Sequence, residues 1–270
     1  MDIKIFQISH VILPEVERHS SFPIFRVGGK SESPPRSDDS SHSLKTCGSI
    51  YDLHFLYGEL LAHHWVWKNV TSTNYVGFFH YRRYFNFGDQ VGDHPKVLLP
   101  GRDLCIRNFC TEKQSELAKS ILKCFDAITI RAEYSREPMS IRWPSHHGLV
   151  AWNALDKILT ERYPFLSHRD FFQINKKFVW YPMFVTSWER YTLIAHLLFE
   201  ILEDVKLELF NPESSVTIDL SFQRILAYLS EPILMLLFHY FKIRSYEAQV
   251  IVSEDDRIPS RLTRIPPDLI

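Results

Sequence analysis

Apolar residues form short runs that alternate with helix-like stripes along the chain. Runs at 3–8, 75–79 and 126–131 are typical of buried strands. Between them, 53–70 and 149–163 carry apolar residues at spacings of three and four, which predicts helices. Alternation of this kind predicts an α/β fold with a mostly parallel central sheet flanked by helices.

The C-terminal part is predicted to be mainly helical. A single apolar stripe over 188–209 predicts the longest helix, and 242–252 is expected to end the core with a strand. We expect one domain over 1–252. The segment 28–49 has the Gly, Ser, Pro and Asp content of a polar loop or flap, and 253–270 is expected to be a peripheral tail.

Two prolines are predicted to interrupt regular structure. Pro182 lies inside the strand-like run 178–186, which indicates an edge strand or a bulge. Pro232 follows a predicted helix over 220–229 and is expected to start a second helical piece, with Ser230 as its cap.

Composition and charge narrow the class of protein. Of the 270 residues, 45% are hydrophobic, which excludes a wholly disordered chain. The 31 Lys and Arg nearly balance 32 Asp and Glu, so no nucleic-acid partner is expected. The four cysteines form no C-x-x-C pair, and neither a signal peptide nor a run of roughly 18 apolar residues is present. We therefore expect a cytoplasmic protein with no transmembrane segment.

The most unusual segment is GFFHYRRYF, where a predicted strand ends at charged residues. His80, Arg82 and Arg83 follow the strand directly, at the edge of an α/β sheet where ligands commonly bind. Guanidinium groups match phosphate oxygens, and Tyr81 and Tyr84 offer flat faces to a nucleobase or a sugar. The alternative is a surface turn with solvated arginines and a packed histidine.

A second candidate is the pair His146 and His147, placed by the sequence at the start of the helix that follows the strand over 126–131. A helix N-terminus attracts anions, so one of the two histidines is a candidate for substrate binding. The alternative is a histidine that only caps the helix.

Three further charged residues lack an evident partner in the sequence. Glu59 lies in an otherwise apolar helix and is expected to pair with Arg82 or Arg83. Arg224 and Glu231 flank a predicted helix end, where they either form an ion pair or reach a substrate hydroxyl.

Other histidines and acids give weaker signals. His63 and His64 are interpreted as packing residues rather than metal ligands. Asp38 and Asp39 lie in the polar loop and form a weak candidate for a divalent cation. Both aspartates, the histidine pair and Glu231 are also candidates for a general base.

The run GELLAHHWVWKN, followed by VGFFHYRRYF, resembles the hallmark of a bacterial family catalogued as domain of unknown function 4422, found among capsular and exopolysaccharide glycosyltransferases. The helix matches at Glu59, Leu60, Trp65, Trp67, Lys68 and Asn69, and the strand end matches from His80 to Phe85. Thinner matches extend the resemblance over about residues 2–252 and include His10, His146 or His147, Arg224 and Glu231. The chain departs from the pattern at Val11, His54, Gly58, Pro182 and Pro232.

The resemblance implies a GT-A-like, Rossmann-like glycosyltransferase of the hexosyltransferase type. Its donor would be a nucleotide-sugar, with a UDP-sugar favoured, and its acceptor a saccharide or lipid-linked saccharide in capsular, exopolysaccharide or O-antigen synthesis. Such a protein would be cytoplasmic or peripheral at the inner membrane face. Many GT-A enzymes hold a divalent ion with a D-x-D motif, but His80 to Arg83 occupy that place here. No metal ligand is assigned, and Mn²⁺ or Mg²⁺ stays an option.

The resemblance also suggests roles for the residues. Catalytic roles are expected for His80, Arg82, Arg83 and Glu59. Substrate binding is expected for His10, Tyr81, Tyr84, His146, His147, Arg224 and Glu231. Loss of either Arg82 or Arg83 is predicted to lower turnover by about two decades.

Two other functions remain as alternatives. One is a metal-dependent hydrolase that uses a cluster of His10, His80, His146 and His147. The other is a catalytically silent carbohydrate-binding protein, which would bind sugar but no nucleotide.

Overall fold

The computed structural model describes most of the chain, namely residues 2–10, 16–27, 42–43, 53–71, 73–89, 94–211, 223–254 and 263–264. Of the predicted flap at 28–49, only two residues belong to these ranges, and Asp38 and Asp39 lie outside them. Most of the predicted tail at 253–270 also lies outside. The limits of the single domain stay a prediction.

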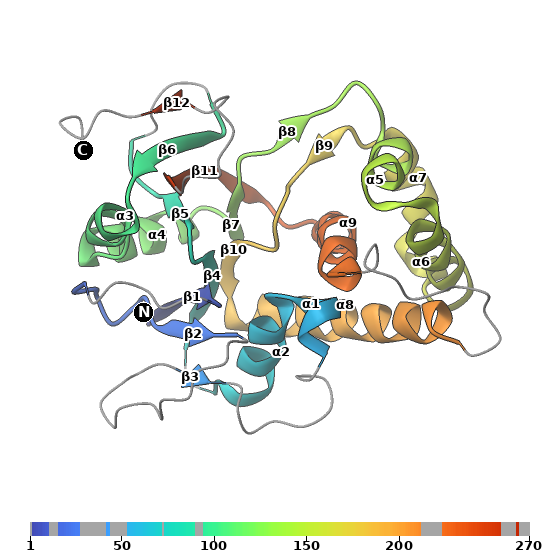
Figure 1. Cartoon of the computed structure of the whole chain (residues 1–270), viewed down its shortest axis with the longest axis horizontal. Coiled ribbons are helices and arrows are strands. Elements are labelled where there is room, and N and C mark those ends of the chain that lie inside the picture. The colour runs from blue at the N-terminus through green and yellow to red at the C-terminus, as the bar shows by residue number, and fades with distance from the viewer. Residues whose placement is uncertain are drawn as a thin grey trace.

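A mixed sheet forms the centre of the described part of the molecule (Figure 1). Its strands follow the order β12-β6-β11-β7-β10-β4-β1-β2-β3, and β5 pairs with β11 and β4. The strands are β1 (Ile3–Ser9), β2 (Ile24–Arg26), β3 (His42–Ser43), β4 (Tyr75–His80), β5 (Arg83–Asn86), β6 (Lys96–Pro100), β7 (Ala127–Ile130), β10 (Phe184–Ser187), β11 (Ser245–Glu254) and β12 (Thr263–Arg264). A separate ribbon pairs β8 (Glu133–Tyr134) with β9 (Lys177–Phe178).

The expectation of a mostly parallel sheet is not confirmed, because two strands reverse direction. Strand β10 runs antiparallel to both β4 and β7, and β5 runs antiparallel to β11 and β4. The pairs of β1 with β2 and β4, and of β11 with β6 and β7, are parallel. Strand β10 also corrects the prediction from Pro182: it lies inside the sheet, and Pro182 stands just before it in the link from β9.

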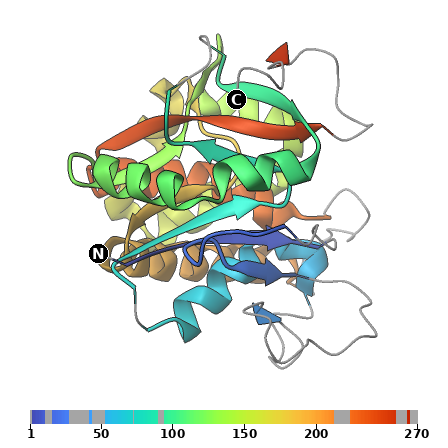
Figure 2. The ribbon, with the colours of Figure 1, turned by 90° about the vertical axis from the view of Figure 1, so that its left-hand side faces the viewer.

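Helices cover both faces of the sheet. Helices α3 and α4 lie on one side, and α2, α8 and α9 lie on the other, with α5, α6 and α7 packed outside them (Figures 1 and 2). Each face has its own hydrophobic core. The helices are α1 (His54–Tyr57), α2 (Leu60–Asn69), α3 (Arg102–Phe109), α4 (Glu112–Leu122), α5 (Met139–His147), α6 (Leu149–Arg162), α7 (His168–Ile174), α8 (Trp188–Leu209) and α9 (Ile225–Tyr240), with a 3-10 turn, η2, at Pro164–Leu166.

The predicted helix over 53–70 is broken into α1 and α2. The break occurs at Gly58, whose φ of 51° lies in the left-handed region that glycine tolerates best. A Cβ at this position would lie 3.0 Å from Nε of Arg224. The glycine therefore serves both the turn and the close approach of a side chain from far along the chain.

The two helical pieces predicted around Pro232 are one helix, α9. A proline in a helix leaves the carbonyl four residues earlier without its N–H partner. Here that carbonyl belongs to Tyr228, and it accepts a hydrogen bond from Nε1 of Trp143 at 3.3 Å. The expected cap is also wrong, because the hydroxyl of Ser230 donates to the carbonyl of Ala227 within the helix.

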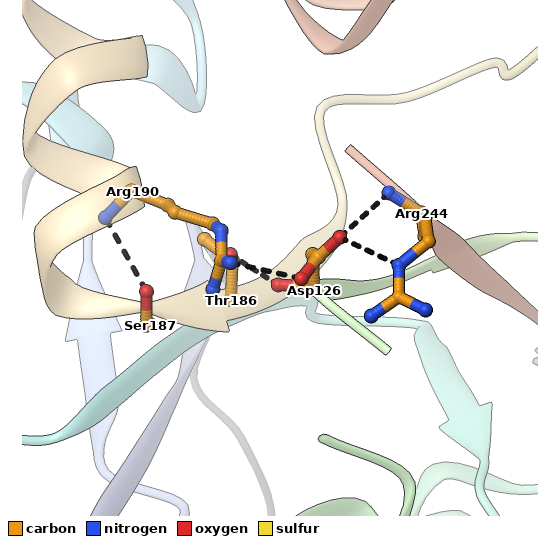
Figure 3. Close-up of polar contacts among 5 residues, drawn as sticks. All are labelled: Asp126, Thr186, Ser187, Arg190 and Arg244. Atoms are coloured by element: carbon orange, nitrogen blue, oxygen red, sulfur yellow. Dashed lines mark hydrogen bonds and ion pairs between the residues drawn. The ribbon is translucent and has the colours of Figure 1, made fainter. Parts of the chain in front are cut away.

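Asp126 fastens four elements at the edge of the sheet where β7 and β11 begin (Figure 3). Its carboxylate accepts from the backbone N–H of Arg244 at 3.0 Å and from the guanidinium of Arg190 at 2.8 Å. Its carbonyl accepts from the hydroxyl of Thr186 at 2.8 Å, and Ser187 caps α8. The N–H of Arg244 is the main reason that the pKa of Asp126 is lowered. This cluster ties down one sheet edge and leaves the opposite edge for ligands.

Among the described helices, none has both the length and the apolar character that a membrane crossing requires.

Candidate functional site

The candidate site lies where three parallel strands end together. Ile8 of β1 stands opposite Phe25 of β2 on one side and His80 of β4 on the other. The residues that follow these strands, including His10 and Val27, therefore meet at one edge of the sheet. The carboxyl ends of parallel strands are the usual place for a ligand in an α/β fold.

Helices α1 and α9 close a pocket of about 210 Å³ over this edge. Strand ends supply part of its wall, and the turn between α1 and α2 and the N-terminus of α9 supply the rest. It is lined by Ile8, His10, Val27, His54, Phe55, Glu59, His80, Gln223 and Arg224. We call this cavity the strand-end pocket.

An ion pair between Glu59 and Arg224 joins two walls of the strand-end pocket. It corrects the expectation that Glu59 pairs with Arg82 or Arg83. Arg224 adopts the left-handed backbone conformation, with φ at 62°, and its N–H donates to the carbonyl of Phe55. The backbone of α1 thus fixes Arg224, and Glu59 orients its guanidinium group.

His80 ends β4 at the floor of the strand-end pocket and is only 9% exposed. Its pKa is well below the usual histidine range, mainly because burial disfavours the imidazolium and also because Arg83 and Arg82 repel it. Its Nδ1 atom is buried and makes no hydrogen bond, and the same holds for Nε of Arg82. Nε of Arg82 can only donate, so an occupant with acceptor atoms would suit this site, since an unsatisfied buried donor is costly.

The remaining histidines of the strand-end pocket are held neutral too. Burial is the largest cause of the lowered pKa of both His10 and His54, followed by the charge of Arg224. Glu59 offsets the charge of Arg224. The charge of Arg82 is not offset in this way, so the area around the strand-end pocket has an excess of positive charge. This electrostatic balance suits an anion.

Arg83 takes part in a second polar cluster, behind the turn between β4 and β5. Its guanidinium carbon lies 3.8 Å from the ring centre of Tyr181. The backbone N–H of Tyr181 donates to Oε1 of Glu231 at 2.9 Å, although Tyr181 has an unfavourable φ of 76°. Burial raises the pKa of Glu231 to about 8. Glu231 therefore does not pair with Arg224, although one interpretation of the sequence allowed such an ion pair. Arg224 lines the strand-end pocket, and Glu231 does not.

The two tyrosines expected to bind substrate are enclosed. Tyr84 is fully buried, and its hydroxyl accepts from Nε2 of Gln7 at 2.7 Å and donates to the carbonyl of Tyr81 at 3.1 Å. Tyr84 is thus a core residue, which corrects its expected exposure to a ligand. Tyr81 is 8% exposed, and its ring packs against the rings of His10 and His80.

The structure does not bring His146 and His147 into the strand-end pocket. They form the last turn of α5 rather than the first turn of α6, which begins only after Gly148. This corrects the expected anion site, because a helix C-terminus carries partial negative charge. His147 stacks on Tyr228 with ring centres 4.5 Å apart, and His146 is exposed.

No site role was assigned from the sequence to three residues of the strand-end pocket and of the cluster around Arg83. His54 and Gln223 line the strand-end pocket, and Tyr181 carries both Arg83 and Glu231. Gln223 directly precedes Arg224, and the candidate role of Arg224 was the sequence signal that could have identified Gln223 as a site residue. Nothing in the local sequence marked Tyr181, because its role depends on the link between β9 and β10.

Within the described ranges, no three His, Cys, Asp or Glu side chains are grouped so that they could hold a metal ion. The four histidines of the hydrolase alternative are divided between the strand-end pocket and α5. The tertiary structure thus separates the cluster on which that alternative depends.

Comparison with known structures agrees with this architecture. The structure is similar to that of the apo form of WbbM, a bifunctional glycosyltransferase, with a TM-score of 0.75 at 20% sequence identity. The similarity covers 94% of this chain but only 46% of that chain, so this protein spans about half its length. The likeness establishes a shared fold.

Sequence comparison gives the family. No curated protein is similar enough to this chain to count as a match. A family model described as domain of unknown function (DUF4422) matches residues 4–242, which include every residue of the strand-end pocket. With so much of the chain matched, this protein belongs to the DUF4422 family.

Proposed function

We propose that the protein is a glycosyltransferase that uses a nucleotide-sugar and binds its diphosphate in the strand-end pocket. The observation that carries the proposal is a pair of buried nitrogen atoms without hydrogen-bond partners, Nδ1 of His80 and Nε of Arg82, at the end of β4 where the strand-end pocket lies. The fold shared with a bifunctional glycosyltransferase supports the same reaction class. The resemblance of the sequence to a GT-A-like family adds to this support.

The chemistry of the transfer explains why these groups are needed. The bond between the anomeric carbon and the diphosphate oxygen breaks, and its electron pair leaves with the diphosphate. The oxygen of the acceptor hydroxyl forms the new bond to that carbon, and the hydroxyl proton passes to a base. Fixed donors and positive charge in a dry site stabilise that developing charge. Arg82 and Arg224 would bind phosphate oxygens, neutral His80 would donate a hydrogen bond, and Glu59 would hold Arg224 in position. Arg83 would add long-range positive charge from its place on Tyr181.

In this proposal arginine charge takes the place of a metal ion. In the described residues, Glu59 is the carboxylate that lines the strand-end pocket, and it is already paired with Arg224. The described side chains of this pocket therefore offer no unpaired carboxylate to Mn²⁺ or Mg²⁺, and no step is assigned to a metal ion. Activity that depends strictly on added Mn²⁺ would contradict this part.

The finer assignment follows the family resemblance. We propose transfer of a hexose, with a UDP-sugar as donor and a saccharide or lipid-linked saccharide as acceptor, in the synthesis of a bacterial surface polysaccharide. We further propose that it works in the cytoplasm or at the inner membrane face.

Thermal unfolding with UDP, GDP and CMP tests the donor site. A nucleotide at about a hundred times its dissociation constant adds about 2.7 kcal/mol to the free energy of unfolding. In a domain of this size the midpoint should rise by roughly 5–10 °C. The rise should occur without metal and should be lost in Arg82→Ala, whereas the exposed control Arg107→Ala should keep it.

Turnover then separates an enzyme from a silent binder. With the matching nucleotide-sugar and an accepted saccharide, Arg82→Ala and Arg83→Ala should each lose about two decades of rate per folded protein, because each removes charge that stabilises the leaving diphosphate. If no nucleotide shifts the midpoint, the donor site is wrong, and sugar binding without nucleotide binding would favour the silent carbohydrate-binding protein.

A further inference from the structure

A second cavity lies between α9, α7 and the sheet, and Tyr181 forms part of its wall. It measures about 330 Å³, within the range of small-molecule sites. Its walls combine aromatic rings with a few polar groups, among them Phe171, Tyr181, Phe238, Ser245, Lys177 and Glu231. We call it the α9 cavity.

Glu231 is the unusual residue of the α9 cavity. The side chain is 8% exposed, and one oxygen is fixed by the N–H of Tyr181. The other oxygen, Oε2, is buried and makes no hydrogen bond. A buried polar atom without a partner is unfavourable, so a ligand that supplies a hydrogen bond to Oε2 is favoured. A ligand hydroxyl can both donate to a carboxyl group and accept from one.

The surroundings of Glu231 favour a neutral ligand. Burial is the main reason for its raised pKa, so the carboxyl group is largely protonated at neutral pH. The charged and titratable groups that act on it are Glu59 in the turn before α2, Arg83 on β5, Lys96 on β6 and Tyr181 before β10. A cation would find no carboxylate charge here.

Two further polar side chains of the α9 cavity, those of Lys177 and Asn175, already have partners. Lys177 pairs with Glu247, and the side chain of Asn175 bonds to the backbone of Lys177 in both directions. A ligand therefore meets rigid polar edges and aromatic walls rather than loose charges. A sugar ring has this combination of an apolar face and a rim of hydroxyl groups.

We propose that the α9 cavity binds a neutral saccharide, with a sugar hydroxyl as the missing hydrogen-bond partner of Glu231. Tyr181 links this cavity to the residues proposed to act on the donor. Its ring packs against the guanidinium of Arg83, and its backbone N–H donates a hydrogen bond to Glu231. The saccharide is accordingly the acceptor of the transfer. That last identification rests on the proposed function, whereas binding of a sugar does not.

Binding of simple glycosides tests the proposal on the full chain. Saturation-transfer NMR is run with methyl β-D-galactopyranoside, methyl α-D-glucopyranoside and methyl α-D-mannopyranoside. We expect at least one to bind, and saturating UDP should not displace it. Ser245→Trp, which fills the α9 cavity, and Glu231→Leu, which removes the hydroxyl partner, should each weaken binding about tenfold.

Matched variants show whether any loss is specific. Ser120→Trp, on the exposed side of α4, should bind like the wild type. Glu231→Gln, which keeps the polar shape, should bind more tightly than Glu231→Leu. The proposal is overturned if none of the three glycosides binds, or if Ser245→Trp or Glu231→Leu binds as well as the wild type. The UDP-induced rise in the unfolding midpoint, measured on the same samples, reports separately on the donor site.

Discussion

His63 illustrates how strongly one buried side chain can depend on the fold. It lies on α2 with its ring stacked on Phe78, the ring centres being 3.6 Å apart. Neither ring nitrogen has a hydrogen-bond partner, and burial lowers its pKa to about 3. The residue thus behaves as an aromatic core residue, as the sequence pattern indicated.

We predict that His63→Leu makes the protein less sensitive to acid. The unfolded chain takes up a proton at His63 near pH 6.5, whereas the folded state stays neutral down to about pH 3. This contribution to stability is therefore present above pH 6.5 and lost as the pH falls. The free energy of unfolding of the variant should gain on the wild type by up to about 1.4 kcal/mol per pH unit between pH 6 and pH 4.

Chemical denaturation at several pH values measures this difference. The control is His196→Leu on the exposed face of α8. If the gap between His63→Leu and the wild type is the same at pH 7 and pH 4, His63 is not buried as a neutral ring.

Individual site residues were predictable where their chemistry was concentrated in sequence. His80 and Arg82 follow one strand, and the structure leaves buried nitrogen atoms of both without hydrogen bonds. The partner of Glu59 was not predictable, because Arg224 stands 165 residues away. Nor was the enclosure of Tyr84, since only a three-dimensional core can distinguish it from Tyr81.

At the scale of elements, α9 tolerates a proline because a neighbouring helix replaces the lost contact. Nε1 of Trp143, on α5, donates to the carbonyl of Tyr228 that Pro232 leaves open. We predict that Trp143→Phe lowers the free energy of unfolding by about 1–3 kcal/mol through this carbonyl, in addition to its loss of packing. Pro232→Ala would supply a helical N–H to the same carbonyl.

A double-mutant cycle isolates this hydrogen bond. In the Pro232→Ala background, Trp143→Phe should cost about 1 kcal/mol less than it does in the wild type, as measured by denaturant unfolding. Equal costs in the two backgrounds would mean that Trp143 contributes only packing.

The periodicity of the sequence predicted most elements that bury a continuous face. Strands β1, β4, β7 and β11 and helices α6 and α8 lie where the pattern placed them. Breaks were harder to predict. The apolar spacing runs on past Gly58 without a change, although α1 ends just before this residue. Pro182 does not mark an edge strand, because the strand that follows it begins only at Phe184. A local pattern reports burial but not direction within a sheet.

At the scale of the whole molecule, the strand-end pocket is closed by a contact between α1 and α9. Gly58 allows this contact, because a Cβ there would press on the guanidinium of Arg224. Gly101 also has a positive φ, at 77°, but nothing lies within 4 Å of its would-be Cβ. The two glycines share a positive φ, with ψ at −129° for Gly58 and 141° for Gly101, and only Gly58 has a side chain packed against it.

We predict that Gly58→Ala weakens UDP binding several-fold and that Gly101→Ala does not. Both variants should lose about 1–2 kcal/mol of folding free energy, since both force a side chain into the left-handed region. Only Gly58→Ala also displaces Arg224. Titration calorimetry with UDP, together with denaturant unfolding, measures both effects. If the two variants bind UDP with equal affinity, Arg224 is not part of the donor site.

The sequence by itself determined the α/β class, the main elements, the packing role of His63 and the concentration of charge at the end of β4. These features follow from periodicity and from neighbouring residues, which act over a few positions. Only the tertiary structure decided the reversal of β10, the pairing of Glu59 with Arg224, the separation of the histidines and the placing of Glu231 in a second cavity. Each of these depends on which distant segments pack together, and that choice minimises exposed apolar surface over the whole chain.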